Sequence, residues 1–177
     1  GSEMCIRDRL YSNRNIRRKQ PGDVLLAYKY FMDELTQEQR DECVLVFHTQ
    51  PCDNNGTDLP RVHRHLCPEY DVCFTYEQGG AFNDEAMNLL FNSADVYINL
   101  ASNEGFGLGS AEAVTVGTPI IVNVTGGLQD QCGFKDDDGN LLTPEDYVEL
   151  GTNHRGRYKN HGEWVKPVWP TSISLQG

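Results

Sequence analysis

A glycine-rich stretch between two apolar runs constrains the fold of this chain more than any other segment. Ala94–Leu100 is the first apolar run, and Ile120–Val122 is the second. Between them stands the sequence SNEGFGLGSAEA, residues 102–113. Short apolar runs bounded by glycine and proline are typical of buried strands, and the residues between them suit a tight loop and a short helix. The sequence therefore predicts the order strand, glycine loop, helix and strand for residues 94–122.

The same alternation of apolar runs and helical patterns continues through the chain. Val24, Tyr28, Phe31 and Leu35 recur at helical spacing, and Val44–Phe47 is an all-apolar run typical of a parallel strand. Further strands are expected at residues 10–12 and 72–76, and further helices at residues 58–66 and 83–92. This alternation predicts an α/β fold, a doubly wound, Rossmann-like parallel sheet with helices on both faces. Ligands bind such sheets beyond the carboxyl ends of the strands.

The length of 177 residues is that of one ordinary domain. We expect residues 1–9 to be a leader outside the fold, because Gly1-Ser2 looks like a cloning remnant and the next residues do not read as the start of a domain. Residues 10–152 are expected to form the Rossmann-like domain. Regular periodicity fades after Gly151, so residues 153–177 are expected to be an irregular tail.

Composition and charge exclude several classes of partner. Hydrophobic residues make up 38% of the chain and charged residues 23%, which is typical of a globular domain. The net charge of −11 argues against general binding to nucleic acid. No apolar run approaches the roughly 20 residues that a membrane-spanning helix needs. We therefore expect no nucleic acid partner, no membrane segment in this chain, and a cytoplasmic protein with reduced cysteines.

Candidate metal ligands are sparse. The six cysteines form no C-x-x-C pair, and although Cys52, His63, His65 and Cys67 lie close in sequence, their spacing matches no common zinc module. We expect no metal site there. The acidic run at residues 136–138 is expected to be a turn.

Two carboxylates flank the glycine loop. Glu104 stands where the predicted strand ends, and Glu112 lies inside the predicted helix. The loop offers unpaired backbone N–H groups at a helix N-terminus, a position that suits a phosphate. Either both glutamates flank one ligand, or Glu112 is the N3 residue of a helix capped by Gly109 and Glu104 is a solvated loop acid. The dinucleotide fingerprint does not fit, because its third glycine position holds Ser110 or Glu112.

Positive charge gathers near the N-terminus, on both sides of the first predicted strand. The cluster is either a basic tail or the lining of a site for a phosphorylated ligand. Its members are Arg7, Arg9, Arg14, Arg17, Arg18 and Lys19. Because the strand ends of a parallel sheet share one edge, we expect the part of the cluster after that strand to meet the Glu104 loop and Thr125–Gly127.

The Glu-x7-Glu pattern of Glu104 and Glu112 resembles the nucleotide-sugar domain of GT-B glycosyltransferases, most closely glycosyltransferase family 4 (group 1). Three more stretches are similar to that family: residues 13–19, 92–96 and 125–128. The resemblance extends over about Leu10–Gly133. It implies that this chain is one half of a GT-B fold, the C-terminal nucleotide-sugar-binding domain.

The resemblance also implies roles for single residues. Arg14 and Lys19 match the Arg and Lys that hold the donor diphosphate and stabilise its charge as it leaves, with Arg18 a neighbouring candidate. Glu104 is expected near the donor sugar, and Glu112 on the ribose hydroxyls. We list Glu104, Arg14 and Lys19 as catalytic. The other donor-binding residues, which offer mainly backbone groups, are expected to be Gly105, Phe106, Gly107, Leu108, Gly126 and Gly127. Tyr76 or Phe82 is expected beside the nucleobase.

The activity implied by the resemblance is hexosyltransferase-like. A retaining enzyme of this kind transfers a sugar from a nucleoside-diphosphate sugar to an acceptor, with the nucleotide sugar as substrate and no further cofactor or metal. The acceptor-binding N-terminal domain is missing from this chain, so we expect the isolated fragment to be inactive in transfer. Two alternatives stay open: a GT-B-fold sugar-nucleotide epimerase, and a catalytically silent nucleotide-sugar-binding module.

Overall fold

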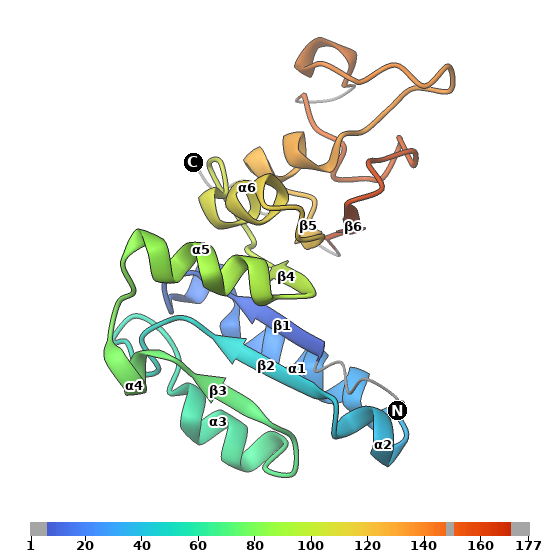
Figure 1. Ribbon diagram of the computed structural model, residues 1–177. Coiled ribbons are helices and arrows are strands. Elements are labelled where there is room, and N and C mark those ends of the chain that lie inside the picture. The colour runs from blue at the N-terminus through green and yellow to red at the C-terminus, as the bar shows by residue number, and fades with distance from the viewer. Residues whose placement is uncertain (1–6, 148–150, 171–177) are drawn as a thin grey trace.

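A computed structural model of the chain describes residues 7–147 and 151–170. Its strands form a six-stranded sheet in the order β3-β2-β1-β4-β5-β6, and every neighbouring pair is parallel (Figure 1). The strands are β1 (Arg7–Tyr11), β2 (Cys43–Phe47), β3 (Val72–Phe74), β4 (Val96–Asn99), β5 (Ile120–Asn123) and β6 (Val165–Val168). This order confirms the predicted doubly wound sheet. The strand order reverses between β1 and β4, which is where such sheets open a crevice for ligands.

Helices connect the strands and cover both faces of the sheet, as predicted. The α-helices are α1 (Pro21–Asp33), α2 (Gln37–Arg40), α3 (Leu59–Leu66), α4 (Tyr76–Gly79), α5 (Asp84–Ser93) and α6 (Leu108–Thr115). The 3₁₀ turns are η1 (Arg17–Lys19), η2 (Gly126–Leu128), η3 (Asp130–Cys132) and η4 (Pro144–Asp146). In the described part of the chain, no helix has the length and apolar character needed to cross a membrane.

Two hydrophobic clusters form the core, one on each face of the sheet. Successive strand residues point to opposite faces, so Leu10 belongs to one cluster and Tyr11 to the other. The first cluster packs β4 and β5 against α5 and α6, whereas the second packs β2 against α1 and α3. Helices therefore cover both faces of the sheet, and a ligand can approach it at the ends of the strands.

The first strand begins earlier than the sequence indicated. Residues 7–9, assigned to the leader, pair with β2 and β4 inside the sheet. Their charged side chains hid the strand, but the Arg9 guanidinium lies 4.2 Å from the centroid of the Phe31 ring on α1. The arginine thus packs against the helix while its backbone joins the ladder.

The C-terminal tail also contains sheet structure, contrary to the expectation that residues 153–177 are irregular. Within its described part, β6 pairs with β5 along its whole length. Pro167 and Lys166 made this segment look unlike a strand, but β6 lies at the edge of the sheet, where proline is tolerated. The fold therefore extends beyond residue 152.

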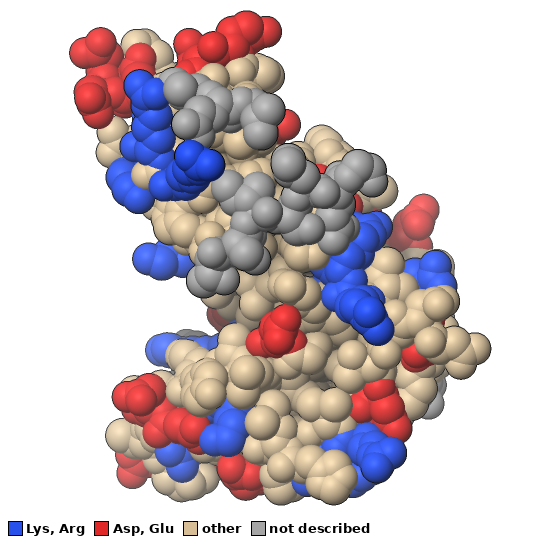
Figure 2. Space-filling view, turned by 180° about the vertical axis from the view of Figure 1, so that it is seen from behind, with Lys and Arg blue, Asp and Glu red and all other residues tan. Residues whose placement is uncertain are grey.

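Residues 129–147 and 151–164 form a lobe between β5 and β6 that projects from the end of the sheet (Figure 1). Acidic and basic side chains are interspersed over the face shown in Figure 2, and both kinds occur on the lobe. The acidic turn expected at residues 136–138 is present: the Asp136 carboxylate accepts the N–H groups of Asp138 and Asn140 at 3.0 and 2.8 Å.

Candidate functional site

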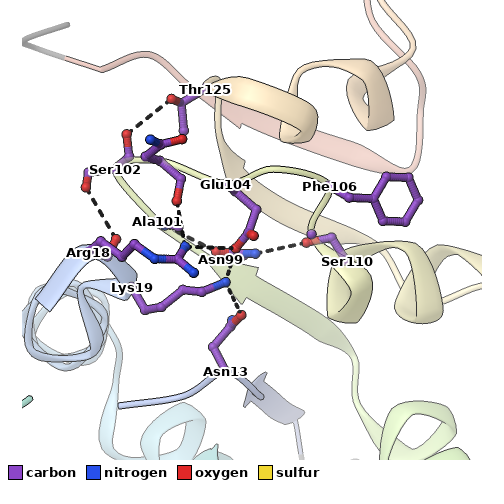
Figure 3. A network of polar contacts seen from close by, with 12 residues as sticks. Asn13, Arg18, Lys19, Asn99, Ala101, Ser102, Glu104, Phe106, Ser110 and Thr125 are labelled. Carbon is purple, nitrogen blue, oxygen red and sulfur yellow. Dashed lines mark hydrogen bonds and ion pairs between the residues drawn. The ribbon is translucent and has the colours of Figure 1, made fainter. Parts of the chain in front are cut away.

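Three loops converge at the carboxyl edge of the sheet, as the topology predicted. They follow β1, β4 and β5 and contact one another directly (Figure 3). The Ser102 N–H donates to the Arg18 carbonyl at 2.8 Å, and the Thr125 hydroxyl donates to the Ser102 carbonyl at 3.2 Å. The Gly127 N–H donates to the Glu104 carbonyl at 2.8 Å. The site is therefore assembled from segments more than eighty residues apart in sequence.

A cluster of three charged side chains lies at the centre of this edge. The Glu104 carboxylate accepts a hydrogen bond from Lys19 Nζ, and Arg18 Nη1 lies 3.8 Å from the same oxygen. The Lys19 and Glu104 side chains are only 10% and 11% exposed. Arg18 also donates to the Asn103 carbonyl at 2.9 Å. Two cations face one carboxylate, so the cluster carries an excess positive charge that suits an anionic ligand.

A chain of hydrogen bonds holds Lys19 in place. Lys19 Nζ donates to Asn13 Oδ1 at 3.0 Å, and Asn13 Nδ2 donates to the Tyr97 hydroxyl at 2.9 Å. The buried Tyr97 hydroxyl in turn donates to the Ser12 carbonyl at 2.9 Å. Burial, together with the neighbouring Arg18, lowers the pKa of Lys19 to about 8. Lys19 is therefore mostly protonated at neutral pH but close to titration.

Glycines allow the loops after β4 and β5 to approach one another closely. A Cβ atom on Gly126 would lie 2.1 Å from the Glu104 carbonyl oxygen, and one on Gly127 would lie 2.2 Å from the Gly105 carbonyl oxygen. Gly107 has a φ of 86°, a left-handed conformation that favours glycine. Helix α6 follows directly and has no side-chain cap. Within residues 7–147 and 151–170, the N–H groups of Gly107 and Leu108 donate to no protein atom.

The N-terminus of α6 excludes one of the two interpretations of Glu112. The N-cap is Gly107 and not Gly109, so Glu112 lies in the second turn of the helix and not at N3. Gly109 is small for a different reason, because its Cβ would lie 2.3 Å from the Tyr97 hydroxyl oxygen. Glu112 itself is exposed and borders a cavity of about 380 Å³ between α5 and α6, lined also by Met87 and Phe91. It does not contact the Lys19–Glu104 pair.

The side chains of the glycine loop are largely exposed. Phe106 is 57% exposed, and Leu108 is 70% exposed. Figure 3 shows the Phe106 ring pointing away from Lys19 and Glu104. Any contact of this loop with a ligand beside Lys19 therefore falls to its backbone, in line with the expectation for Gly105–Leu108, which stays a prediction.

Arg14 lies apart from Glu104, although it was expected to share a site with Lys19. Its side chain is 65% exposed, and its Nε lies 3.3 Å from the Asp53 carboxylate. Arg14 and Asp53 line a cavity of about 530 Å³ together with Asn13, His48 and Tyr76. Asn13 thus borders both this cavity and the Lys19 cluster, so the two are adjacent. Arg18, the neighbouring candidate, is the arginine that faces Glu104.

His48 was not identified from the sequence. It follows the apolar run of β2, and its Nδ1 lies 2.7 Å from the Thr75 hydroxyl. Its ring centroid lies 4.9 Å from that of Tyr76 and 4.6 Å from that of Phe82, the two aromatic residues expected near a nucleobase. Burial lowers the pKa of His48, which favours the neutral ring. The buried hydroxyl of Thr49, which borders the same cavity, has no hydrogen-bond partner among the described residues.

The described residues contain no group of three or more histidine, cysteine, aspartate or glutamate side chains that could hold a metal ion. His63, one member of the weak zinc pattern, has its Nε2 2.9 Å from the Tyr70 carbonyl oxygen.

Comparison with known proteins gives one family match and several solved structures of similar fold. Residues 71–151 match the family described as Glycosyl transferases group 1. No curated protein sequence matches the chain significantly. A solved sucrose-phosphate synthase from Thermosynechococcus elongatus is 25% identical, with a TM-score of 0.55 over 72% of this chain and 30% of that one.

Two more solved structures share the fold at lower identity. OtsA without ligand is 11% identical, with a TM-score of 0.58 over 71% of this chain and 31% of its own. An alpha,alpha-trehalose-phosphate synthase (UDP-forming) from Burkholderia vietnamiensis is 10% identical, with a TM-score of 0.57 over 73% of this chain and 33% of its own. The chain spans about a third of the length of these structures. Its sheet is Rossmann-like and has the fold of one half of a GT-B protein, and residues 71–151 are similar to the family Glycosyl transferases group 1.

Proposed function

We propose that this chain binds the nucleoside-diphosphate sugar of a retaining glycosyltransferase and forms the donor half of its active site. The observation that carries the proposal is the largely buried Lys19–Glu104 pair, flanked by the half-exposed Arg18, beside the uncapped N-terminus of α6. Side-chain cations and free backbone N–H groups converge there, and this combination suits a diphosphate. The family match over residues 71–151 supports sugar transfer as the reaction class.

In the proposed complex the diphosphate contacts Lys19, Arg18 and the backbone of Gly107 and Leu108. The donor sugar lies beside Glu104, near the backbone of Gly126 and Gly127. The nucleobase occupies the cavity bordered by His48 and Tyr76, and the ribose reaches Glu112 on α6. Arg14 borders the same cavity and leaves Asp53 to approach a phosphate. These assignments are supported by the two cavities, one bordered by Arg14, His48 and Tyr76 and the other by Glu112.

The chemistry proposed for the site is stabilisation of the leaving diphosphate. When the bond between the sugar and the diphosphate breaks, negative charge accumulates on the diphosphate oxygens, and fixed cations lower the energy of that state. Lys19 is pre-oriented by Asn13 and Glu104, so little reorganisation is needed. Glu104 then serves as a sugar-positioning acid. No side chain of the described residues is assigned as a covalent nucleophile.

The acceptor site is proposed to lie in a second domain. The chain spans about a third of the solved structures that it resembles, and the GT-B cleft lies between two Rossmann-like domains. Without the second domain the acceptor is not held near the donor, and the rate gain from positioning is lost. We expect the 177-residue chain to bind the donor, to hydrolyse it slowly at most, and to transfer no sugar. We also propose that it works in the cytoplasm, where nucleotide sugars are made.

A donor panel with a matched pair of variants tests the proposal. One solved relative is described as UDP-forming, so UDP and UDP-glucose are suitable first ligands. Lys19→Ala should weaken binding in a calorimetric titration by roughly ten- to hundredfold, the usual scale for a lost charge-assisted bond. Lys29→Ala is the control, because Lys29 pairs with Asp33 on the surface of α1. Absence of binding to every nucleotide sugar in the panel would overturn the proposal.

Turnover by a two-domain protein that contains this chain separates the alternatives. Transfer to an acceptor supports the glycosyltransferase. Epimerisation of the donor without an acceptor indicates a sugar-nucleotide epimerase. Donor binding without either reaction indicates a silent binding module.

A further inference from the structure

The lobe after β5 reaches the glycine loop through one side chain. Gln131 Nε2 donates to the carbonyl oxygens of both Phe106 and Gly107. Because the C=O and N–H of a trans peptide point in opposite directions, these two bonds turn the N–H groups of Gly107 and Leu108 away from Gln131. Those are the N–H groups that have no acceptor in the described part of the chain. Gln131 therefore sets the direction in which the loop presents its donors.

The position of Gln131 depends in turn on Trp164. The indole Nε1 donates to the Gln131 carbonyl at 3.0 Å. The indole ring packs over two glycines: a Cβ on Gly133 would lie 2.8 Å from Trp164 Cζ2, and one on Gly162 would lie 2.5 Å from the ring. The Trp164 carbonyl accepts the N–H of Ile120, which begins β5. Trp164 thus ties the lobe and the last strand to the backbone of Gln131.

We propose that Gln131 is a positioning residue for the donor diphosphate and that Trp164 makes the segment after residue 151 part of the same site. This segment lies beyond the family match, which ends at residue 151. The inference rests on the proposed function, because it assumes that phosphate oxygens meet the N–H groups of Gly107 and Leu108. The Gly127 N–H already holds the loop at the Glu104 carbonyl, so Gly127 and Gln131 clamp the loop at two successive points.

The proposal predicts a selective effect on phosphate binding. Gln131→Met removes both N–H donors at similar size, and Trp164→Phe removes the indole N–H while it keeps an aromatic ring. UDP uses the loop and uridine does not, so both variants should weaken UDP binding and leave uridine binding unchanged. We expect about tenfold weaker UDP binding for Gln131→Met and about threefold for Trp164→Phe.

The matched control is Trp169→Phe. Trp169 belongs to the same segment and stacks on Phe134 with ring centroids 5.5 Å apart, but it has no bond to Gln131 among the described residues. This variant should bind UDP as the parent chain does. Equal losses for UDP and uridine, or equal losses for Trp164→Phe and Trp169→Phe, would show general destabilisation of the lobe and overturn the inference.

Hydrogen exchange tests the clamp without any nucleotide. Amides at residues 105–109 should exchange faster in Gln131→Met and Trp164→Phe, with strands β4 and β5 unchanged. If the parent chain binds no nucleotide, the proposed function fails, and exchange alone decides whether the clamp exists. Unchanged exchange at residues 105–109 in Gln131→Met would overturn the positioning role.

Discussion

The two sides of the candidate site reach the same edge of the sheet by different means. On the β1 side, Arg18 and Lys19 contribute charged side chains, and Asn13 and Glu104 hold the lysine in place. On the β4 and β5 side, the surface is backbone apart from the Glu104 carboxylate, and the two loops approach closely because Gly126 and Gly127 lack a Cβ atom. A substitution on the β1 side removes the contacts of one side chain. A substitution at Gly126 or Gly127 pushes the two loops apart and so disturbs all the contacts between them. The comparison predicts that substitutions on the two sides have different signatures.

Breaking the backbone side should give the largest effect. A Cβ on Gly127 would lie 2.2 Å from the Gly105 carbonyl oxygen and 2.7 Å from the Phe106 Cα. Gly127→Ala should therefore lower the free energy of unfolding by about 3 kcal/mol and abolish UDP binding. Gly105→Ala is the control, because no atom lies within 4 Å of its Cβ position. Equal denaturation midpoints for the two variants would mean that the loops do not approach as closely as described.

On the side-chain side, the arginine nearest Glu104 should matter more than the arginine that pairs with Asp53. Arg18→Ala should weaken UDP binding by roughly 1.5–3 kcal/mol without a change in stability. Arg14→Ala should weaken UDP binding less, by about 1 kcal/mol, because the Arg14 side chain is 65% exposed and already pairs with Asp53. Calorimetric titration of both variants checks the order. The reverse order would place the diphosphate beside Arg14 and His48 instead.

Substitutions at Glu104 and Glu112 should distinguish the sugar position from the ribose position. Glu112→Gln should weaken UDP and UDP-glucose equally, by about 1 kcal/mol, because the ribose is common to both ligands. Glu104→Gln should weaken UDP-glucose more than UDP, because Glu104 lies beside the proposed sugar position. The ratio of the two dissociation constants is the measurement. If both variants change that ratio alike, the two roles are not separate.

The smallest expected effect is a pH dependence from Lys19. With a pKa of about 8 in the free protein, Lys19 loses its proton as the pH rises through that value, and the diphosphate binds the protonated form. UDP affinity should be full below pH 7 and fall about threefold between pH 7.5 and 8.5. Lys19→Arg should remove the dependence, because arginine stays charged throughout. A fall that persists in Lys19→Arg would come from another group.

Much of the fold could be predicted because its signals are local. Apolar runs such as Val44–Phe47 and helical spacing from Val24 onward are set by which face each residue buries. The edge strand β6 could not be predicted, because Lys166 and Pro167 carry no strand signal of their own. The start of β1 at Arg7–Arg9 could not be predicted for the same reason. These charged residues form a strand because they pair with β2, whose sequence lies more than thirty residues away.

The residues of the candidate site also differ in whether a local sequence pattern identifies them. Glu104, Lys19 and the glycines stand in recognisable local patterns, and the structure brings Lys19, Arg18, Glu104, Gly126 and Gly127 together. His48 and Gln131 have no such pattern, because each acts on a partner at least 24 residues away. Asn13 stands in the stretch 13–19, but its bond to Tyr97 spans 84 residues and depends on the fold. Arg14 matched the family spacing, yet only the fold decides that its side chain faces Asp53.

The proline in β6 has a consequence for association between molecules. Trp164 and Val168 direct their carbonyls toward β5, so the backbone groups of Val165 and Pro167 face the open edge. Pro167 has no N–H, and the Val165 N–H already donates to the Gly162 carbonyl at 3.4 Å. A strand from another chain therefore finds no free donor between residues 165 and 167. This edge of the sheet is protected against aggregation by strand addition, even though the rest of the ladder is regular.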